Sequence, residues 1–171
     1  MRQFCSPLAM AVLLMTTTCL VARDDEKEEK VALDKVPEAV LKAVKDRFKD
    51  AKLVSAQTEK ENGKLLYEIN LKEKDRAIDV TVTPEGKIVS IEKTISSKDL
   101  PRPVKEAINK KYPKAEFKGI EEITEDGKTN YEVLLVTADK KKIEVVLDRD
   151  GKIVKEEAKD EKGGEKDKKN E

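Results

Sequence analysis

Residues 36–48 of the chain read VPEAVLKAVKDRF, and a related stretch, LPRPVKEAINKKY, occupies residues 100–112. The offset is 64, and the similarity continues beyond these two stretches. The further matches are Gly63-Lys64 with Gly127-Lys128, Tyr67-Glu68-Ile69 with Tyr131-Glu132-Val133, and, at an offset of 65, Gly86-Lys87-Ile88-Val89 with Gly151-Lys152-Ile153-Val154. Self-similarity over this length indicates one structural unit present twice. One residue inserted in a turn accounts for the change of offset.

Each copy is predicted to open with an amphipathic helix. Pro37 and Pro101 suit the start of a helix, where the missing N–H costs nothing. The apolar residues that follow recur at helical spacing; they are Val40, Leu41, Val44 and Phe48 in the first copy and Val104, Ala107, Ile108 and Tyr112 in the second. We expect the first helix to end near Lys49–Ala51 and the second before Pro113.

The remainder of each copy alternates apolar and polar residues in the manner of half-buried antiparallel strands. One predicted strand face carries Leu65, Tyr67, Ile69 and Leu71, and the next carries Ile78, Val80 and Val82. Asn62-Gly63, Pro84-Glu85-Gly86, Asp126-Gly127 and Asp150-Gly151 separate the apolar runs and suit hairpin turns. The sequence therefore predicts an α+β fold of two tandem units, each one helix packed on an antiparallel sheet of about four strands.

The predicted organisation has five parts. They are a signal peptide over 1–22, a charged linker over 23–32, a first unit over 33–95, a second unit over 96–157, and a charged tail over 158–171. From about Lys155 onward almost nothing apolar offsets the entropy of ordering, so we expect the tail to be disordered. A unit of about 60 residues is marginal alone, and association of the two copies, as neighbouring sheets, would add burial.

The first 22 residues have the layout of a secretory signal, with Arg2 followed by an apolar run too short to span a bilayer. Both cysteines, Cys5 and Cys19, lie in this leader, so cleavage after Ala22 leaves no thiol for a disulfide or a metal site. The alternatives are a lipoprotein anchored at Cys19 and an N-terminal helix retained in the fold. We expect a secreted or periplasmic protein with no membrane span.

Composition excludes several classes of function. The chain has 171 residues with 36 Lys+Arg, 36 Asp+Glu and no His. Without His there is no Ser-His-Asp or Cys-His nucleophile system and no imidazole metal site. A near-neutral surface of mixed sign argues against a nucleic-acid binder, which gains affinity by concentrating Lys and Arg on phosphates.

Five features of the sequence resemble the PepSY-like family. They are the helix that opens with Pro, the Tyr112-Pro113-x-Ala115 segment, the Gly-Lys hairpin, the Tyr-Glu-Val/Ile strand and the final Asp-x-x-Gly-Lys-Ile-Val hairpin. That family is related to the β-lactamase-inhibitor-protein fold, and the resemblance covers about residues 34–157. It implies an exported bacterial protein of a non-catalytic kind that binds or restrains enzymes of the envelope. Lys49 stands where the first copy should have the Pro, which weakens that helix stop.

Candidate chemistry is sparse. Glu68, Asp79, Glu132 and Glu144 are predicted to face away from the helices, where solvent leaves their pKa values unperturbed. Asp148-x-Asp150-Gly151 looks like the start of a calcium loop, but Lys152 resumes a strand at once, so a hairpin turn is the preferred interpretation. The aromatic residues of the two units, namely Phe48, Tyr67, Tyr112, Phe117 and Tyr131, all occupy predicted core positions. Few aromatic anchors are therefore left for a tight interface.

One difference between the copies points to binding. Where the first copy has Asn70, Lys72 and Thr81 on its outer face, the second has Leu134, Val136 and Val146. These three form a candidate partner-docking patch, with burial against the other copy or the linker as the alternative.

The leading hypothesis is an exported, monomeric, non-catalytic module that binds or inhibits a protein or peptide of the bacterial cell envelope, without cofactor, metal or catalytic residues. The alternative is a cation-binding or structural envelope protein. A carboxylate-dependent hydrolase would need a buried pair of acids in a pocket.

Overall fold

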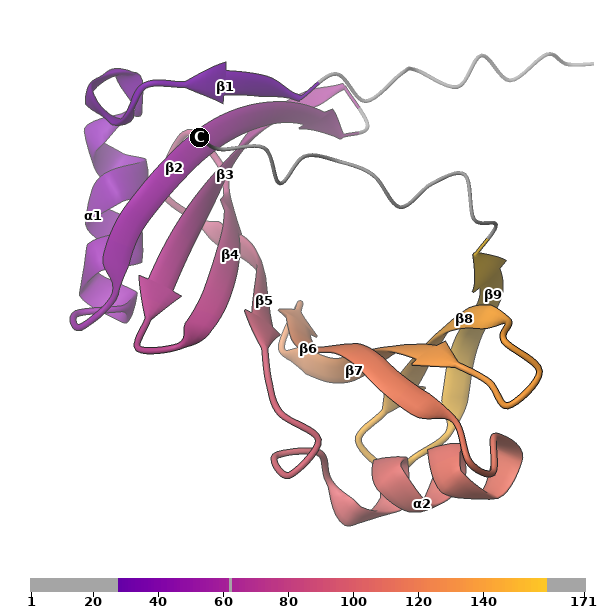
Figure 1. Cartoon of the computed structure of the whole chain (residues 1–171). Helices are drawn as coiled ribbons and strands as arrows, with labels where there is room; N and C mark the ends of the chain where they lie inside the picture. Colours follow the sequence, from indigo (N-terminus) through magenta and orange to yellow (C-terminus); the bar gives the residue numbers. More distant parts are fainter. Residues whose placement is uncertain (1–27, 62, 160–171) are drawn as a thin grey trace, which may run out of the picture.

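The computed structural model describes residues 28–61 and 63–159. They form one open antiparallel sheet and two α-helices, so the predicted α+β class is confirmed (Figure 1). The elements are β1 Glu29–Val31, a 3-10 helix Leu33–Lys35, α1 Glu38–Arg47, β2 Lys52–Glu61, β3 Lys64–Glu73, β4 Arg76–Val82, β5 Ile88–Thr94, α2 Arg102–Lys111, β6 Glu116–Glu125, β7 Lys128–Val136, β8 Lys142–Asp148 and β9 Ile153–Lys159. The signal-peptide prediction, with both cysteines, lies outside the described residues.

The sheet is continuous, with nine strands in the order of the sequence from β1 to β9. We expected neighbouring sheets of about four strands. Instead, β5 and β6 pair through five residue pairs, from Ser90 opposite Glu125 to Thr94 opposite Glu121. The alternation within each copy does not specify this long-range pairing, because it sets which face a side chain occupies and leaves open which strand lies beside which.

Both ends of the sheet extend further than the charge pattern suggested. Glu29–Val31, inside the segment predicted as a charged linker, pairs as β1 with Thr58–Ala56 of β2. At the other end, β9 runs to Lys159, past the point where disorder was expected to begin, and pairs along β8. Backbone hydrogen bonds to an open sheet edge stabilise a strand even where its side chains are charged. Residues 160–171 lie outside the described part.

Each helix begins directly after the predicted proline. Pro37 precedes α1 and Pro101 precedes α2, and both have φ near −55° (−54° and −55°). Both helices end at equivalent places, with Phe48 and Tyr112 each donating a backbone N–H to the carbonyl four residues earlier. The first helix therefore stops at Arg47, slightly before the predicted region.

The hydrophobic core is divided into two clusters, one under each helix. Val40 and Val44 of α1 pack on Ile69, Val80 and Val82. The equivalent residues of the second cluster are Val104 and Ile108 of α2 with Val133, Val145 and Leu147. All ten are almost inaccessible to solvent. The five aromatic residues belong to or pack against these clusters, as predicted. Leu65, which was predicted to share the apolar strand face, is instead 40% exposed, whereas its neighbour Leu66 is 5% exposed.

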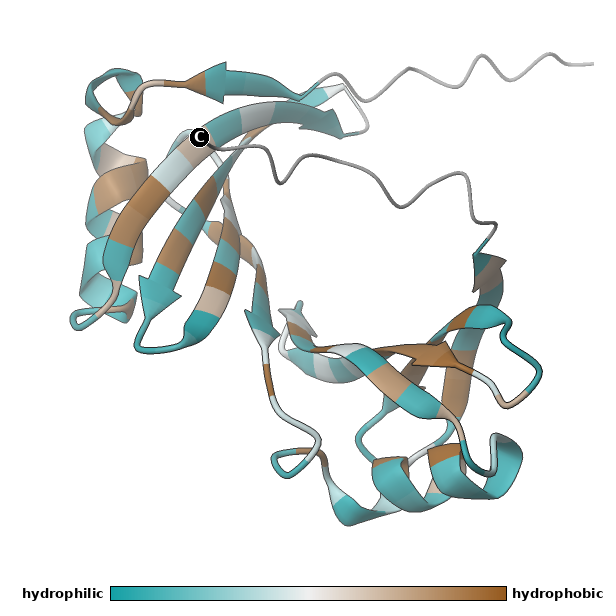
Figure 2. Ribbon diagram, in the orientation of Figure 1, coloured by the Kyte–Doolittle hydropathy of each residue, from teal (hydrophilic) through white to brown (hydrophobic). Residues whose placement is uncertain are grey.

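The two helices cover the same face of the sheet. Ile91, which packs on the first cluster, is directly opposite Thr124, and Thr124 shares its face with Ile120 of the second cluster. In Figure 1 both helices lie on the outside of the bent sheet, and Figure 2 shows apolar and polar residues alternating along its strands. The other side, here called the helix-free face, has no described helix on it.

Two glycines allow turns of the sheet to approach the helices closely. Gly86 and Gly151 have φ of +87° and +83°, in the left-handed region that glycine favours. A Cβ atom on Gly86 would lie 2.7 Å from the Ala39 carbonyl oxygen, and one on Gly151 would lie 2.5 Å from that of Pro103. The two turns therefore hold the start of each helix against the sheet in the same way.

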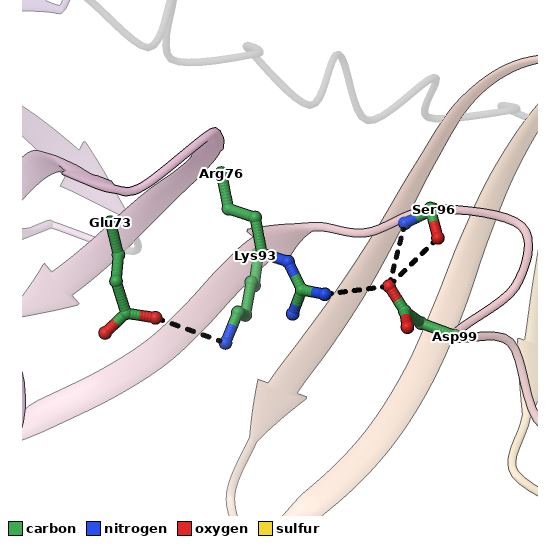
Figure 3. A network of polar contacts seen from close by, with 5 residues as sticks. All are labelled: Glu73, Arg76, Lys93, Ser96 and Asp99. Atoms are coloured by element: carbon green, nitrogen blue, oxygen red, sulfur yellow. Dashed lines mark hydrogen bonds and ion pairs between the residues drawn. The ribbon is translucent and has the colours of Figure 1, made fainter.

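The connection between β5 and α2 is tied to the first half of the molecule. Asp99 Oδ2 accepts hydrogen bonds from the Ser96 backbone N–H and hydroxyl, and it lies 2.9 Å from Nη2 of Arg76 on β4 (Figure 3). Beside it, Lys93 of β5 pairs with Glu73 of β3 at 3.9 Å. The hydrogen bonds from Ser96, with Arg76 adding to them, hold the pKa of Asp99 below its usual value.

Candidate functional site

The helix-free face carries one carboxylate on each of six successive strands. We call this set the acidic row, and it consists of Glu68, Asp79, Glu92, Glu121, Glu132 and Glu144, on β3 to β8 in that order. Each side chain is half-buried, because it alternates with residues that pack into the cores on the other side of the sheet. The sequence predicted the orientation of four of these six correctly.

Register places members of the row directly opposite one another. Asp79 is opposite Glu92 across β4 and β5, and Glu121 is opposite Glu132 across β6 and β7. Like charges at directly opposite positions destabilise a sheet. The row therefore works against folding stability at these pairs.

The row also changes the ionisation of its members. Burial, with Glu121, Asp79, Glu132 and Glu68 adding to it, raises the pKa of Glu92 to about 7. Burial and neighbouring carboxylates also raise the pKa values of Glu121 and Glu132. The prediction that solvent leaves these acids unperturbed is therefore wrong for Glu132. Partial desolvation and like charge both disfavour the ionised form.

Two local arrangements moderate the repulsion. In the first half, the Asn70 amide donates to Glu68 Oε1 and to Asp79 Oδ1, each at 2.7 Å, and Asn70 Oδ1 accepts from the Ser55 hydroxyl at 2.6 Å. In the second half, Lys159 Nζ lies 2.7 Å from Glu144 Oε2. The centre of the row, at Glu92 and Glu121, receives neither of these partners.

A hollow of about 250 Å³ lies beside the row on the same face. We call it the acidic hollow, and its lining residues are Glu59, Glu61, Glu68, Thr81, Val89, Ser90, Glu92, Ile123 and Glu125. Five of these nine residues are glutamate and none is basic. The hollow spans β2 to β6 and therefore crosses the junction between the two halves.

The predicted docking residues also lie on the helix-free face. Leu134 and Val136 of β7 and Val146 of β8 are half-buried. They are interleaved with charge, because Leu134 is directly opposite Glu144, Val136 opposite Lys142 and Val146 opposite Glu132. The apolar positions are therefore separated by charged ones across these strands.

The candidate calcium loop is a hairpin turn between β8 and β9. Asp148 Oδ1 accepts hydrogen bonds from the backbone N–H groups of Asp150 and Lys152, at 3.0 and 2.9 Å. In the described part of the chain, no group of three or more acids is arranged to hold a metal ion. No Asp or Glu described by the structure is fully buried. None of the described helices is long and apolar enough to cross a bilayer.

Glu92 and Glu121 were not among the sequence candidates. Glu92 lies in Ile91-Glu92-Lys93 of β5, and Glu121 lies in Ile120-Glu121-Glu122 of β6. The alternation of these segments signals an outward-facing acid. Their position near each other depends on the β5–β6 pairing, which the alternation alone does not specify.

Two family models match the chain. Residues 36–92 match the model described as "Peptidase propeptide and YPEB domain", PepSY. Residues 89–155 match the model described as "Putative beta-lactamase-inhibitor-like, PepSY-like". The two matched regions meet within β5. No protein of curated function matches the chain significantly.

Solved structures from Bacteroides species share the fold. A "putative periplasmic" protein from Bacteroides eggerthii has a TM-score of 0.62 at 12% identity, over 72% of this chain and 88% of its own. A DUF2874 family protein from Bacteroides uniformis has a TM-score of 0.61 at 13% identity, over 71% and 88%. A BLIP-like protein from Bacteroides fragilis has a TM-score of 0.58 at 16% identity, over 78% and 92%.

These likenesses cover 71% to 78% of the chain. They concern the fold, whereas the family matches concern the sequence itself. The resemblance of this chain to the PepSY-like family is therefore confirmed, with a PepSY match in its first half and a PepSY-like match in its second.

Proposed function

We propose that the protein is an exported, non-catalytic binding module of the bacterial cell envelope, secreted or periplasmic, that recognises a protein or peptide partner through its helix-free face. The observation that carries this proposal is the acidic row, a set of half-buried carboxylates on a sheet face that no described element covers. The fold shared with a BLIP-like protein and with a protein described as periplasmic supports it.

We further propose that the chain consists of two tandem units, 33–95 and 96–157. The division of the core into two clusters supports this, as do the two adjoining family matches. Equivalent irregularities add support, because β2 and β6 both bulge after an aromatic or aliphatic core residue, at Leu53 and Phe117. A bulge bends its strand and increases the local twist. Such bends suit a sheet that curves around its own helix-free face.

The patch of Leu134, Val136 and Val146 would form the apolar part of the docking surface. A partner that covers it would contact apolar and acidic side chains together, because the register interleaves them. Interfaces commonly combine an apolar centre with surrounding polar contacts.

Site-specific photo-crosslinking tests the proposed face. A photoreactive residue at Leu134 or Thr94 reports on the helix-free face, and one at Lys42 or Lys105 reports on the exposed side of a helix. In envelope extract we expect the first pair to crosslink to the same protein and the second pair to leave that protein unlabelled. Equal labelling from both sides would contradict the proposal.

The double variant Leu134→Gln/Val146→Gln tests the patch with neutral replacements, because each residue is directly opposite a glutamate of the acidic row. We expect a nearly unchanged melting temperature with loss of the crosslink from Thr94, because both residues are half-buried and not part of the described core clusters. A large fall in melting temperature would instead show that the patch is buried within the protein.

A further inference from the structure

The acidic hollow differs in chemistry from a small-molecule pocket. Pockets for such ligands are mostly apolar and about 300–1,000 Å³ in volume. The acidic hollow measures about 250 Å³ and is lined mainly by glutamate. Its size suits a single side chain rather than a whole metabolite.

One residue that lines the hollow, Glu92, has strongly acidic surroundings. The charged groups that act on Glu92 come from four other strands and are all carboxylates, namely Glu68 on β3, Asp79 on β4, Glu121 on β6 and Glu132 on β7. None of the nine residues lining the hollow is basic. Glu92 therefore lies in an environment of negative charge.

The lining also offers apolar contact. Val89 and Ile123 line the hollow together with the glutamates. Lysine and arginine bury their aliphatic stems against apolar surface while the charged end bonds to acceptors. A carboxylate that binds a cationic group forms the stronger, charge-assisted kind of hydrogen bond.

We propose that the acidic hollow receives a lysine or arginine side chain from a basic segment of the protein partner that docks on the helix-free face. This inference rests on the proposed function and names the chemistry of the partner. Three properties of the hollow support the inference together. They are its negative charge, its apolar contact for the aliphatic stem, and a volume suited to one side chain. The remaining carboxylates of the acidic row would attract further cationic residues of the same segment.

Binding should depend on pH. Glu92 must be ionised to bind a cation, and its pKa of about 7 leaves about a tenth of it ionised at pH 6 and about nine tenths at pH 8. If the protonated form does not bind, the apparent affinity falls about tenfold from pH 8 to pH 6. The charged groups that face Glu92 are Glu68, Asp79, Glu121 and Glu132, and the negative charge of each contributes to the raised pKa of Glu92.

The test measures binding of a capped peptide of alternating lysine and alanine to the full chain by calorimetry. Peptides with glutamine or glutamate in place of lysine serve as references. We expect binding of the lysine peptide alone, weakened about tenfold or more by the double variant Glu68→Gln/Glu92→Gln. The matched control is Glu38→Gln/Asp75→Asn, which removes the same charge at exposed sites away from the hollow.

A second variant tests the hollow without the peptide. Ser90→Lys adds a lysine to the lining of the hollow, and Ser90→Gln is its neutral control. We expect Ser90→Lys to melt at a higher temperature than Ser90→Gln and to bind the lysine peptide at least about tenfold less tightly, because its own ammonium group occupies the site.

Equal peptide binding by the hollow variant and its charge-matched control would overturn the inference. A titration with calcium chloride in place of the peptide gives a second such outcome. If wild type binds calcium and Glu68→Gln/Glu92→Gln does not, the hollow holds a divalent cation and the inference is overturned. The crosslinking experiment separates the two proposals. Crosslinks restricted to the helix-free face, together with no peptide binding, would leave the proposed function standing and refute the basic partner.

Discussion

The two halves of the molecule match on the helix side of the sheet and differ on the helix-free side. On the helix side, Val40 and Val44 correspond to Val104 and Ile108, and all four are almost fully buried. On the other side, Glu68 and Asp79 are bridged by the Asn70 amide. The equivalent acids, Glu132 and Glu144, have Leu134 in the place of that amide.

This difference shows which side of the sheet builds the fold. The apolar residues under each helix exclude water and hold helix and sheet together, so equivalent positions keep similar size in both halves. The helix-free positions contribute little to either described core. Their residue types differ between the halves, and their carboxylates repel one another, which indicates that stability did not determine them.

The largest effect is expected from truncating equivalent core residues. Leu71 and Leu135 are 3% and 0% exposed, one in each cluster. Replacing either by Ala removes buried apolar volume and should lower the free energy of unfolding by about 3 kcal/mol. We expect Leu71→Ala to increase hydrogen exchange mainly in residues 36–82, and Leu135→Ala to do so mainly in residues 100–147.

Exchange measured by mass spectrometry over the whole described chain distinguishes the two outcomes. Each variant serves as the control for the other. If both variants raise exchange equally in both halves, the nine-stranded sheet unfolds as a single cooperative unit and the proposed division into two units is wrong.

A smaller effect is expected from exchanging the residues that differ. Asn70→Leu removes the amide that donates to Glu68 and Asp79, and it should cost about 1–2 kcal/mol, because two carboxylates lose a hydrogen bond. The reverse change, Leu134→Asn, supplies such an amide between Glu132 and Glu144. A hydrogen bond donated to a carboxylate stabilises its ionised form. Leu134→Asn should therefore lower the pKa of Glu132 from its raised value. Carboxyl-detected NMR titration of both variants measures this, and an unchanged pKa of Glu132 would show that the two halves are not equivalent here.

The helices, their proline starts and the inward-facing residues were predictable, because they depend on local periodicity and on the repeat. The pairing of β5 with β6 was not, since nothing in the alternation of Ile88–Thr94 indicates its neighbour. The acidic row depends on that pairing, so only its outer members, such as Glu68 and Glu144, were identified from the sequence. The perturbed ionisation of Glu92 follows from the register, and it could not be deduced before the register was known.

We infer that the helix side of the sheet stabilises the fold and that the acidic row is kept in spite of its cost in stability. Glu92 tests this most directly. Its carboxyl has a pKa of about 7 in the folded protein, against an ordinary value of 4.5 that we take for the unfolded chain. The folded state therefore binds more protons between these values, and the stability of the protein falls as the pH rises from about 4.5 to about 7.

Glu92→Gln removes this loss. For a fully buried group the two pKa values correspond to about 3 kcal/mol, and solvent screening of the half-exposed Glu92 reduces the expected gain to about 1 kcal/mol. The decisive measurement is the free energy of unfolding of wild type and Glu92→Gln by urea denaturation at pH 5 and pH 8, with Glu106→Gln, whose carboxylate pairs with Arg102 on α2, as the control. We expect Glu92→Gln to be the more stable protein at pH 8 and to gain little at pH 5. A Glu92→Gln protein less stable than wild type at pH 8 would contradict it, because the carboxylate would then be holding the fold together.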